Sequence, residues 1–312
     1  MNEKFTKSNF LKISQEVLNF QLSTLYPILV QNGYHRASLI FLNHDRNFST
    51  FLTVRYLVEH ERVVDIYALS RVMFDSIISM GLLTKSLIPN DLERYQNYQF
   101  VESYKYYSHL EKLGLANLSG ISSSDVLMLK AKRNEYLSKY GKDGSTWTGK
   151  SLEENVKLLD NNFPRTCNEQ HFHEYLYCQV YRKGSPATHS SFAGLGKGVE
   201  TEEFIIPGSL TGHRFKTNEP HLIFPCFHSL LVFLSSIRFM GHSLQKVEAE
   251  QYFHNVTEHI ISEWGFHTII LNCRGARWLR SSRCTVQMRL IMMLSAKPNT
   301  GRDRFFIVKV LG

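Results

Sequence analysis

The first 116 residues are a succession of long segments with helical periodicity, and this feature limits the fold more than any other. In residues 10–33, 34–60 and 63–87, apolar side chains recur at steps of three and four, as they do on one face of an α-helix. Residues 91–114 are more polar and rich in tyrosine, and they end at a glycine that suits a helix C-terminus. The sequence therefore predicts four long helices in this half of the chain.

Helical patterning continues in the second half, with one long interruption. Helices are expected at residues 125–140, at residues 151–160, which begin with a capping-box pattern, and from about residue 169. Residues 193–220 form a long glycine-containing loop whose centre, GVETEEFIIPGSL, includes a candidate short strand. Helical periodicity returns from residue 221 to about residue 265. The predicted fold class is all-α: an irregular bundle of long antiparallel helices in one domain.

One predicted helix is about as long as a membrane span. Residues 222–240, LIFPCFHSLLVFLSSIRFM, are strongly apolar, but Pro225, His228 and Arg238 interrupt the run. A charged arginine inside a membrane span is costly. This segment is therefore interpreted as a buried bundle helix, and no membrane is expected as a partner.

The cysteines and the start of the chain favour a cytoplasmic protein. The first residues, MNEKFTKSNFLKISQEV, contain no long apolar run of the kind found in a secretory signal. The cysteines are odd in number, scattered and never arranged as CxxC, which fits reduced thiols better than disulfides or a zinc site. They are Cys167, Cys178, Cys226, Cys273 and Cys284.

The net charge of +8 comes from the C-terminal end of the chain. Residues 272–312 hold nine basic residues and one acid, Asp303, whereas the rest of the chain has 27 of each sign. The neutral body therefore does not suggest a nucleic-acid-binding surface. Because helical periodicity also stops near Leu271, we expect a helical domain, residues 1–271, followed by a basic tail, residues 272–312, that is not integral to the fold. A nucleic-acid-binding extension and foreign sequence after a gene interruption both explain this tail, and the loss of periodicity favours the second.

The stretch YLYCQVYRKGSPATHSS, residues 175–191, contains a polar ladder. Tyr177, Tyr181, Ser185 and His189 are four residues apart and would share one face of a helix. Pro186 is expected to kink or end that helix near Ser185. Two interpretations are open: a hydrogen-bonded polar layer in the core, or a site in which His189 is an acid, a base or a ligand.

Arg182 and His189, with six residues between them, resemble the arginine–histidine motif of HEPN-type ribonucleases. The resemblance implies RNA cleavage in which histidine transfers a proton and arginine holds the phosphate. Lys183 stands where that motif usually has a polar residue, and Gly184 and Pro186 depart from its helix geometry. The ribonuclease function is therefore kept as the alternative hypothesis.

Charged side chains also occur on an otherwise apolar predicted helix, at Arg71 and Asp75. Burial would force these two residues to pair with each other or with a partner helix. They are interpreted either as a structural ion pair or as the charged wall of a pocket. We expect them to lie near Ser185 and His189 across a helix contact, since both groups need polar partners.

No cofactor and no metal are expected. His171 and His173 could face one metal ion only on a strand or loop, and no carboxylate cluster accompanies them. GLGKG, residues 194–198, lacks the context and the ending of a phosphate-binding loop.

Three segments together resemble the bacterial family catalogued as domain of unknown function 5677: ALSRVMFDSIISMGLL, WTGKSLEENVKLLD and YLYCQVYRKGSPATHSSF. In that family an apolar helix carries an arginine and, four residues later, an acid; a tryptophan precedes a short helix; and a tyrosine, a serine and a histidine share a further helix. The residues at these places are Arg71, Asp75, Trp147, Tyr181, Ser185 and His189, with Asp75 replacing the commoner glutamate. The resemblance covers roughly residues 25–265 and implies an all-helical cytosolic bacterial protein whose polar residues share one central site, but it implies no biochemical activity.

Two functional hypotheses follow. The first is an uncharacterised helical protein with a polar cluster in its core and an association with defence against phages by analogy of fold. Arg71, Asp75 and Trp147 are its expected binding residues, and Tyr181, Arg182, Ser185 and His189 its candidate catalytic residues. The second is a metal-independent, HEPN-like ribonuclease toxin that uses Arg182 and His189. A homodimer is considered under both hypotheses, and RNA is expected as a partner only under the second.

Overall fold

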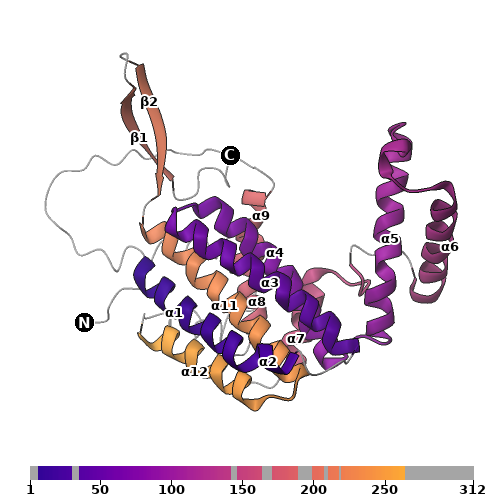
Figure 1. Ribbon diagram of the computed structural model, residues 1–312, viewed down its shortest axis with the longest axis horizontal. Helices are drawn as coiled ribbons and strands as arrows, with labels where there is room; N and C mark the ends of the chain where they lie inside the picture. The colour runs from indigo at the N-terminus through magenta and orange to yellow at the C-terminus, as the bar shows by residue number, and fades with distance from the viewer. Residues whose placement is uncertain are drawn as a thin grey trace, which may run out of the picture. The chain divides into compact units, whose positions relative to one another are not determined.

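The computed structural model describes residues 6–29, 35–141, 146–163, 171–188, 199–206, 210–217 and 219–263. Most of these residues are helical, which confirms the all-α prediction (Figure 1). The first half of the chain forms α1 (Lys7–Phe20), the π-helix η1 (Gln21–Leu25), α2 (Tyr26–Leu29), α3 (His35–Glu59), α4 (Val63–Lys85), α5 (Asp91–Lys112), the 3₁₀-helix η2 (Ala116–Ser119) and α6 (Ser123–Tyr140). The second half forms α7 (Leu152–Asn162), α8 (Phe172–Leu176), the π-helix η3 (Tyr177–Arg182), α9 (Lys183–Thr188), β1 (Val199–Ile206), β2 (Leu210–Thr217), α11 (Glu219–Ser243) and α12 (Val247–Glu263).

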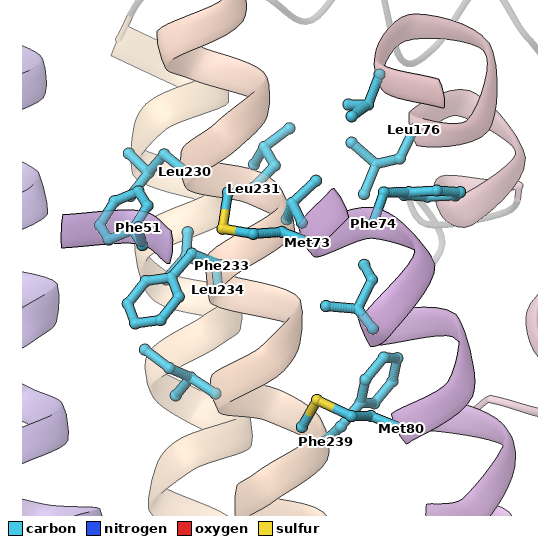
Figure 2. Close-up of a cluster of buried hydrophobic side chains, with 14 of the residues drawn as sticks. Phe51, Met73, Phe74, Met80, Leu176, Leu230, Leu231, Phe233, Leu234 and Phe239 are labelled. Carbon is cyan, nitrogen blue, oxygen red and sulfur yellow. The ribbon is translucent and has the colours of Figure 1, made fainter. Parts of the chain in front are cut away.

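Helix α4 is the centre of the bundle. It packs against α3 and α11, which also contact each other, and against α7, η3 and α9 (Figure 1). Neighbours on several sides explain why this helix is apolar over much of its circumference rather than along a single stripe. Figure 2 shows Met73, Phe74 and Met80 of α4 in the same apolar cluster as Leu231 and Phe233 of α11.

The ends of the site-bearing helices follow from local sequence. Helix α7 begins with a complete capping box, in which the Ser151 side chain accepts from the Glu154 amide and the Glu154 carboxylate accepts from the Ser151 amide. Helix α4 ends at Ser86, which has a left-handed backbone conformation with φ of 52° and donates its amide to the last turn of the helix. Both ends lie close to where the sequence pattern predicts them.

A β-hairpin replaces part of the loop expected at residues 193–220. Strand β1 pairs antiparallel with β2, in a register that runs from Val199 opposite Thr217 to Ile206 opposite Leu210. Strand β1 confirms the short strand expected within residues 198–210, whereas β2 lies where only loop was expected, so that part of the prediction was wrong. Threonine and phenylalanine occur in both strands, β1 adds valine and isoleucine, and the intervening sequence Pro-Gly-Ser favours a chain reversal.

Helix α9 continues through Pro186 to Thr188, so the helix does not end at Ser185, which was one of the two expected effects of the proline. The residues before α9 form the π-helix η3, whose wider turn ends at Arg182, four residues before the proline. A proline ring crowds the carbonyl four residues earlier in a regular α-helix.

Two helices are long and apolar enough to cross a membrane, judged by length and composition: residues 63–85 of α4 and residues 221–243 of α11. Of the most apolar window of each, 67% and 89% is buried inside the protein. The prediction that residues 222–240 form a buried bundle helix is confirmed. Arg238 is accommodated there because its guanidinium lies 3.3 Å from the Glu250 carboxylate and 4.8 Å from the centre of the Phe253 ring.

The basic tail predicted at residues 272–312 lies outside the described residues, which end at Glu263. The proposed division into residues 1–271 and 272–312 therefore stays a prediction.

Candidate functional site

A pocket of about 520 Å³ is formed by α4, α5, α7, η3 and the segment that precedes α7. Ile78 and Leu82 of α4 and Leu152 of α7 provide apolar lining. Aromatic side chains from three separate parts of the chain also line the pocket: Tyr98, Trp147, Tyr177 and Tyr181. A concave, largely apolar site with a few polar groups is typical of small-molecule binding.

The two tyrosines of η3 line the pocket, and Arg71 of α4 supports them from outside the lining. The rings of Tyr177 and Tyr181 stack with their centres 5.3 Å apart and their planes 15° from parallel. The Arg71 guanidinium lies 4.4 Å from the centre of the Tyr181 ring, and its Nη2 donates a 3.2 Å hydrogen bond to the Tyr181 hydroxyl. Contacts to both the face and the hydroxyl of Tyr181 hold the ring in a fixed position.

Trp147, another aromatic residue of the pocket lining, is held by hydrogen bonds to two helices. Its Nε1 donates a 3.1 Å hydrogen bond to the Ser79 hydroxyl on α4, and its carbonyl accepts a 2.9 Å hydrogen bond from Tyr136 of α6. The next residue is held as well, since Arg94 of α5 donates to the Thr148 carbonyl at 2.9 Å. These bonds fix a segment without helical structure against three helices.

Asp75 is the carboxylate of α4 that lines the pocket. Its side chain is exposed because it faces the open pocket, yet the surrounding protein atoms still remove part of its hydration. This desolvation raises the pKa of Asp75 to about 6, and the charge of Arg71 opposes the shift without cancelling it. Asp75 can therefore gain or lose a proton near neutral pH, which an ordinary surface aspartate cannot do.

Two further hydrogen-bond acceptors line the pocket from α7. Asn155 is 3% exposed; its Nδ2 donates to the Thr148 hydroxyl at 2.9 Å, while its buried Oδ1 accepts no hydrogen bond from the described residues. Glu153 lies 2.7 Å from the Lys157 ammonium, and this hydrogen bond lowers the pKa of Glu153.

The structure brings Arg71, Asp75, Trp147 and Tyr181 together at this pocket, although Arg71 is held behind Tyr181 rather than in the lining. Ser185 lies on α9, which packs closely on α4 beside Arg71: a Cβ atom at Gly184 would lie 3.2 Å from the Arg71 Cβ atom. Ser185 is not among the described residues that line the pocket.

The predicted arginine–histidine pair is described only at its arginine. Arg182 is exposed, with its guanidinium 5.6 Å from the centre of the Tyr177 ring. His189 lies outside the described residues.

Sequence reasoning missed a buried polar pair, Asp160 and His173. The two side chains are 5% and 3% exposed, and their Oδ1 and Nδ1 atoms are 2.6 Å apart. The Asp160 carboxylate also accepts from the backbone amides of His173 and Glu174, at 3.0 and 2.9 Å, so it binds the first turn of α8. A buried aspartate and a histidine 13 residues apart form no recognisable local motif, and the pair was therefore invisible before the fold was known.

The histidines of this region do not share a metal site. His171 is exposed and lies 3.2 Å from Glu174, whereas His173 is buried against Asp160. Within the part of the chain that the structure describes, no group of three or more histidine, cysteine, aspartate or glutamate side chains is arranged to hold a metal ion.

Two more histidines, His44 and His228, are fully part of the core. Burial lowers the pKa of His44 to about 4 and that of His228 to about 3. The His228 Nδ1 donates to the Phe224 carbonyl at 2.7 Å, so its Nε2 accepts the 2.8 Å hydrogen bond from the Tyr175 hydroxyl. Both residues are neutral core histidines; the His44 Nδ1 lies 2.7 Å from the Ser236 hydroxyl, while its Nε2 has no hydrogen-bond partner among the described residues.

The architecture and the pocket define a helical bundle protein with an aromatic, acidic site. The model of the family of unknown function DUF5677 matches residues 37–205, more than half of the chain, and the chain belongs to this family. The matched range is shorter than the roughly 25–265 expected from the resemblance, but it contains every predicted site residue. No curated protein and no solved structure gives a significant match.

Proposed function

We propose that this protein binds a small organic molecule in the pocket between α4, α7 and η3, with Asp75 as the ionisable group of the site. The observation that carries the proposal is the combination at one place of an aromatic-lined pocket of about 520 Å³ and a carboxyl group whose pKa is raised to about 6. Perturbed acids in clefts are typical of functional sites. With such a pKa, Asp75 is suited to exchange a proton with a bound molecule.

A purely structural role explains Asp75 less well. A structural ion pair with Arg71 would hold the carboxylate ionised and lower its pKa, whereas the net shift is upward. The Arg71 guanidinium instead contacts the face and the hydroxyl of Tyr181. The ionised carboxylate thus costs stability in the folded protein, a cost commonly found where a residue is kept for function.

Filling the pocket tests this proposal. Leu152→Trp, at the first position of α7, should occupy the pocket and abolish the binding of fragment molecules that bind the wild type, because Leu152 lines the pocket and the larger indole would fill part of its volume. Binding is measured by ligand-detected NMR with a fragment library that contains cations, anions and neutral compounds.

Leu158→Trp on the same helix is the matched control, since Leu158 packs against the core but does not line the pocket. It should retain the fragments that the wild type binds. The proposal is wrong if no fragment binds the wild type, or if every fragment binds equally well to a folded Leu152→Trp variant.

RNA cleavage by Arg182 and His189 is the alternative, and the exposure of Arg182 is the observation that favours it. The described lining of the pocket contains Asp75 and Glu153 and no basic side chain, which is unfavourable for a phosphate backbone. Expression in bacteria followed by total-RNA profiling decides between the two. Cleavage that His189→Ala abolishes would support the alternative, and an unchanged RNA profile would remove its support.

A bacterial cytoplasmic location and a role in defence against phages are the finer parts of the proposal. Both rest on the character of the sequence and on analogy with other helical proteins. Plaque counts on cells that express the wild type or Asp75→Asn test the defence role: protection that requires Asp75 would support it, and equal plaque numbers with and without the wild type would contradict it.

A further inference from the structure

We infer that the ligand of this pocket is an organic cation that carries N–H donors, such as an amidinium or a protonated amine attached to an apolar body. This inference rests on the proposed function and names the chemical class of its ligand. Three observations support it: the hydrogen-bond acceptors of the lining, the surroundings of the Asp75 carboxylate and the aromatic rings that line the pocket.

The ionisable acids of the pocket lining are hydrogen-bond acceptors. Asp75 and Glu153 contribute carboxylates, and the described lining includes no lysine, arginine or histidine. The buried Asn155 Oδ1 accepts no hydrogen bond from the described residues, while the Nδ2 of the same amide is engaged by Thr148. The ionisable groups of the lining therefore favour a positively charged ligand that carries N–H donors.

Among the described residues, no cation lies close enough to Asp75 to offset its desolvation. The cations nearest the pocket are held by other groups: Arg71 by Tyr181, Arg182 by the Tyr177 ring, and Lys157 by Glu153. Of these, Arg71 attracts the Asp75 carboxylate, but its effect is smaller than that of desolvation. A ligand cation inside the pocket would provide the missing partner, and an anionic ligand would be repelled by both carboxylates.

The aromatic lining favours the same class of ligand. Guanidinium groups already lie against the rings of Tyr181 and Tyr177, at 4.4 and 5.6 Å from their centres, so these two rings have cation partners within the protein. Trp147 and Tyr98 add two more rings to the lining. A planar amidinium can combine a bidentate hydrogen bond to a carboxylate with contact against an aromatic face.

Benzamidine, benzamide and benzoate are matched probes for this inference, because they share one ring and differ in charge. Isothermal titration calorimetry at pH 7.5 should give an affinity for benzamidine on the order of tenfold to a hundredfold above that for benzamide, the range expected for a charge-assisted hydrogen bond. Benzoate should bind more weakly than benzamide. Asp75→Asn should reduce the preference for benzamidine to about threefold or less, because it removes the charge and keeps the shape.

Asp65→Asn is the matched control on the same helix, since Asp65 is 50% exposed and pairs with Arg62 outside the pocket. It should leave all three affinities unchanged. Benzyltrimethylammonium should bind more weakly than benzamidine, because it carries the charge but no N–H donor.

The outcomes separate this inference from the proposed function. Equal binding of benzamidine and benzamide, or tighter binding of benzoate, would overturn the cationic class while leaving the pocket a binding site. Equal binding of benzyltrimethylammonium and benzamidine would contradict the requirement for N–H donors. If none of these probes binds, the inference is wrong, whereas the proposed function still stands or falls with the Leu152→Trp experiment.

Discussion

Phe233→Ala is expected to reduce the free energy of unfolding by about 3–5 kcal/mol. Phe233 of α11 is fully buried, and its ring stacks on that of Phe51 from α3, with centres 4.3 Å apart and planes 9° from parallel. Figure 2 shows both rings in the apolar cluster between the helices. The substitution removes this stacking and leaves a cavity that rigid helices cannot fill. A loss of this size is a large share of the stability of a typical domain.

Urea denaturation of the wild type and the variant measures this effect. Leu127→Ala on α6 is the control, because Leu127 is 71% exposed and its truncation should change stability by no more than about 0.5 kcal/mol. A loss below about 1 kcal/mol for Phe233→Ala would contradict the placement of α11 in the centre of the bundle.

Asp160→Ala should also cost about 3–5 kcal/mol, the range for removing one partner of a buried pair. The Asp160 carboxylate accepts hydrogen bonds from the His173 ring, the His173 amide and the Glu174 amide. Without it, these three donors stay in a region where water has little access. The first turn of α8, and with it the start of the segment that carries Tyr177 and Tyr181, should lose its anchor.

Thermal and denaturant unfolding measure the stability of Asp160→Ala against that of Asp65→Ala. Asp65 takes part in an exposed ion pair with Arg62, so its removal should change stability by about 0.5 kcal/mol or less. If the two variants lose the same small amount, the buried pair contributes nothing to the anchoring of α8.

Local patterns predicted the helices well because helix formation depends on neighbours a few residues apart. The periodicity of α4, the capping box of α7 and the family resemblance at Arg71, Asp75 and Trp147 are all visible in contiguous sequence. The expected end of the helix at Ser185 was wrong, since the helical path runs from η3 through Pro186 to Thr188, and a π-helix such as η3 has no simple sequence signal.

The pocket could be predicted only in part, because its lining depends on how separate elements pack together. Arg71, Asp75, Trp147 and Tyr181 were singled out as polar or aromatic residues within recognisable segments. Tyr98 and Asn155 were not, because nothing in their own segments marks them as pocket residues. They become part of the site through the packing of separate elements, such as α5, whose Arg94 donates to the carbonyl of Thr148, 54 residues later in the chain.

Titration of the Asp75 carboxyl group tests directly whether Asp75 is the ionisable group of a pocket that binds an organic cation. The side-chain carboxyl ¹³C shift, assigned by its loss in Asp75→Asn, is followed against pH in the free protein and with benzamidine. The account predicts a midpoint at about pH 6 for the free protein, since desolvation disfavours the ionised form. It predicts a lower midpoint with benzamidine, because a bound cation favours the carboxylate. A midpoint close to 4, the ordinary value for an aspartate, that does not move when benzamidine is added would contradict the account.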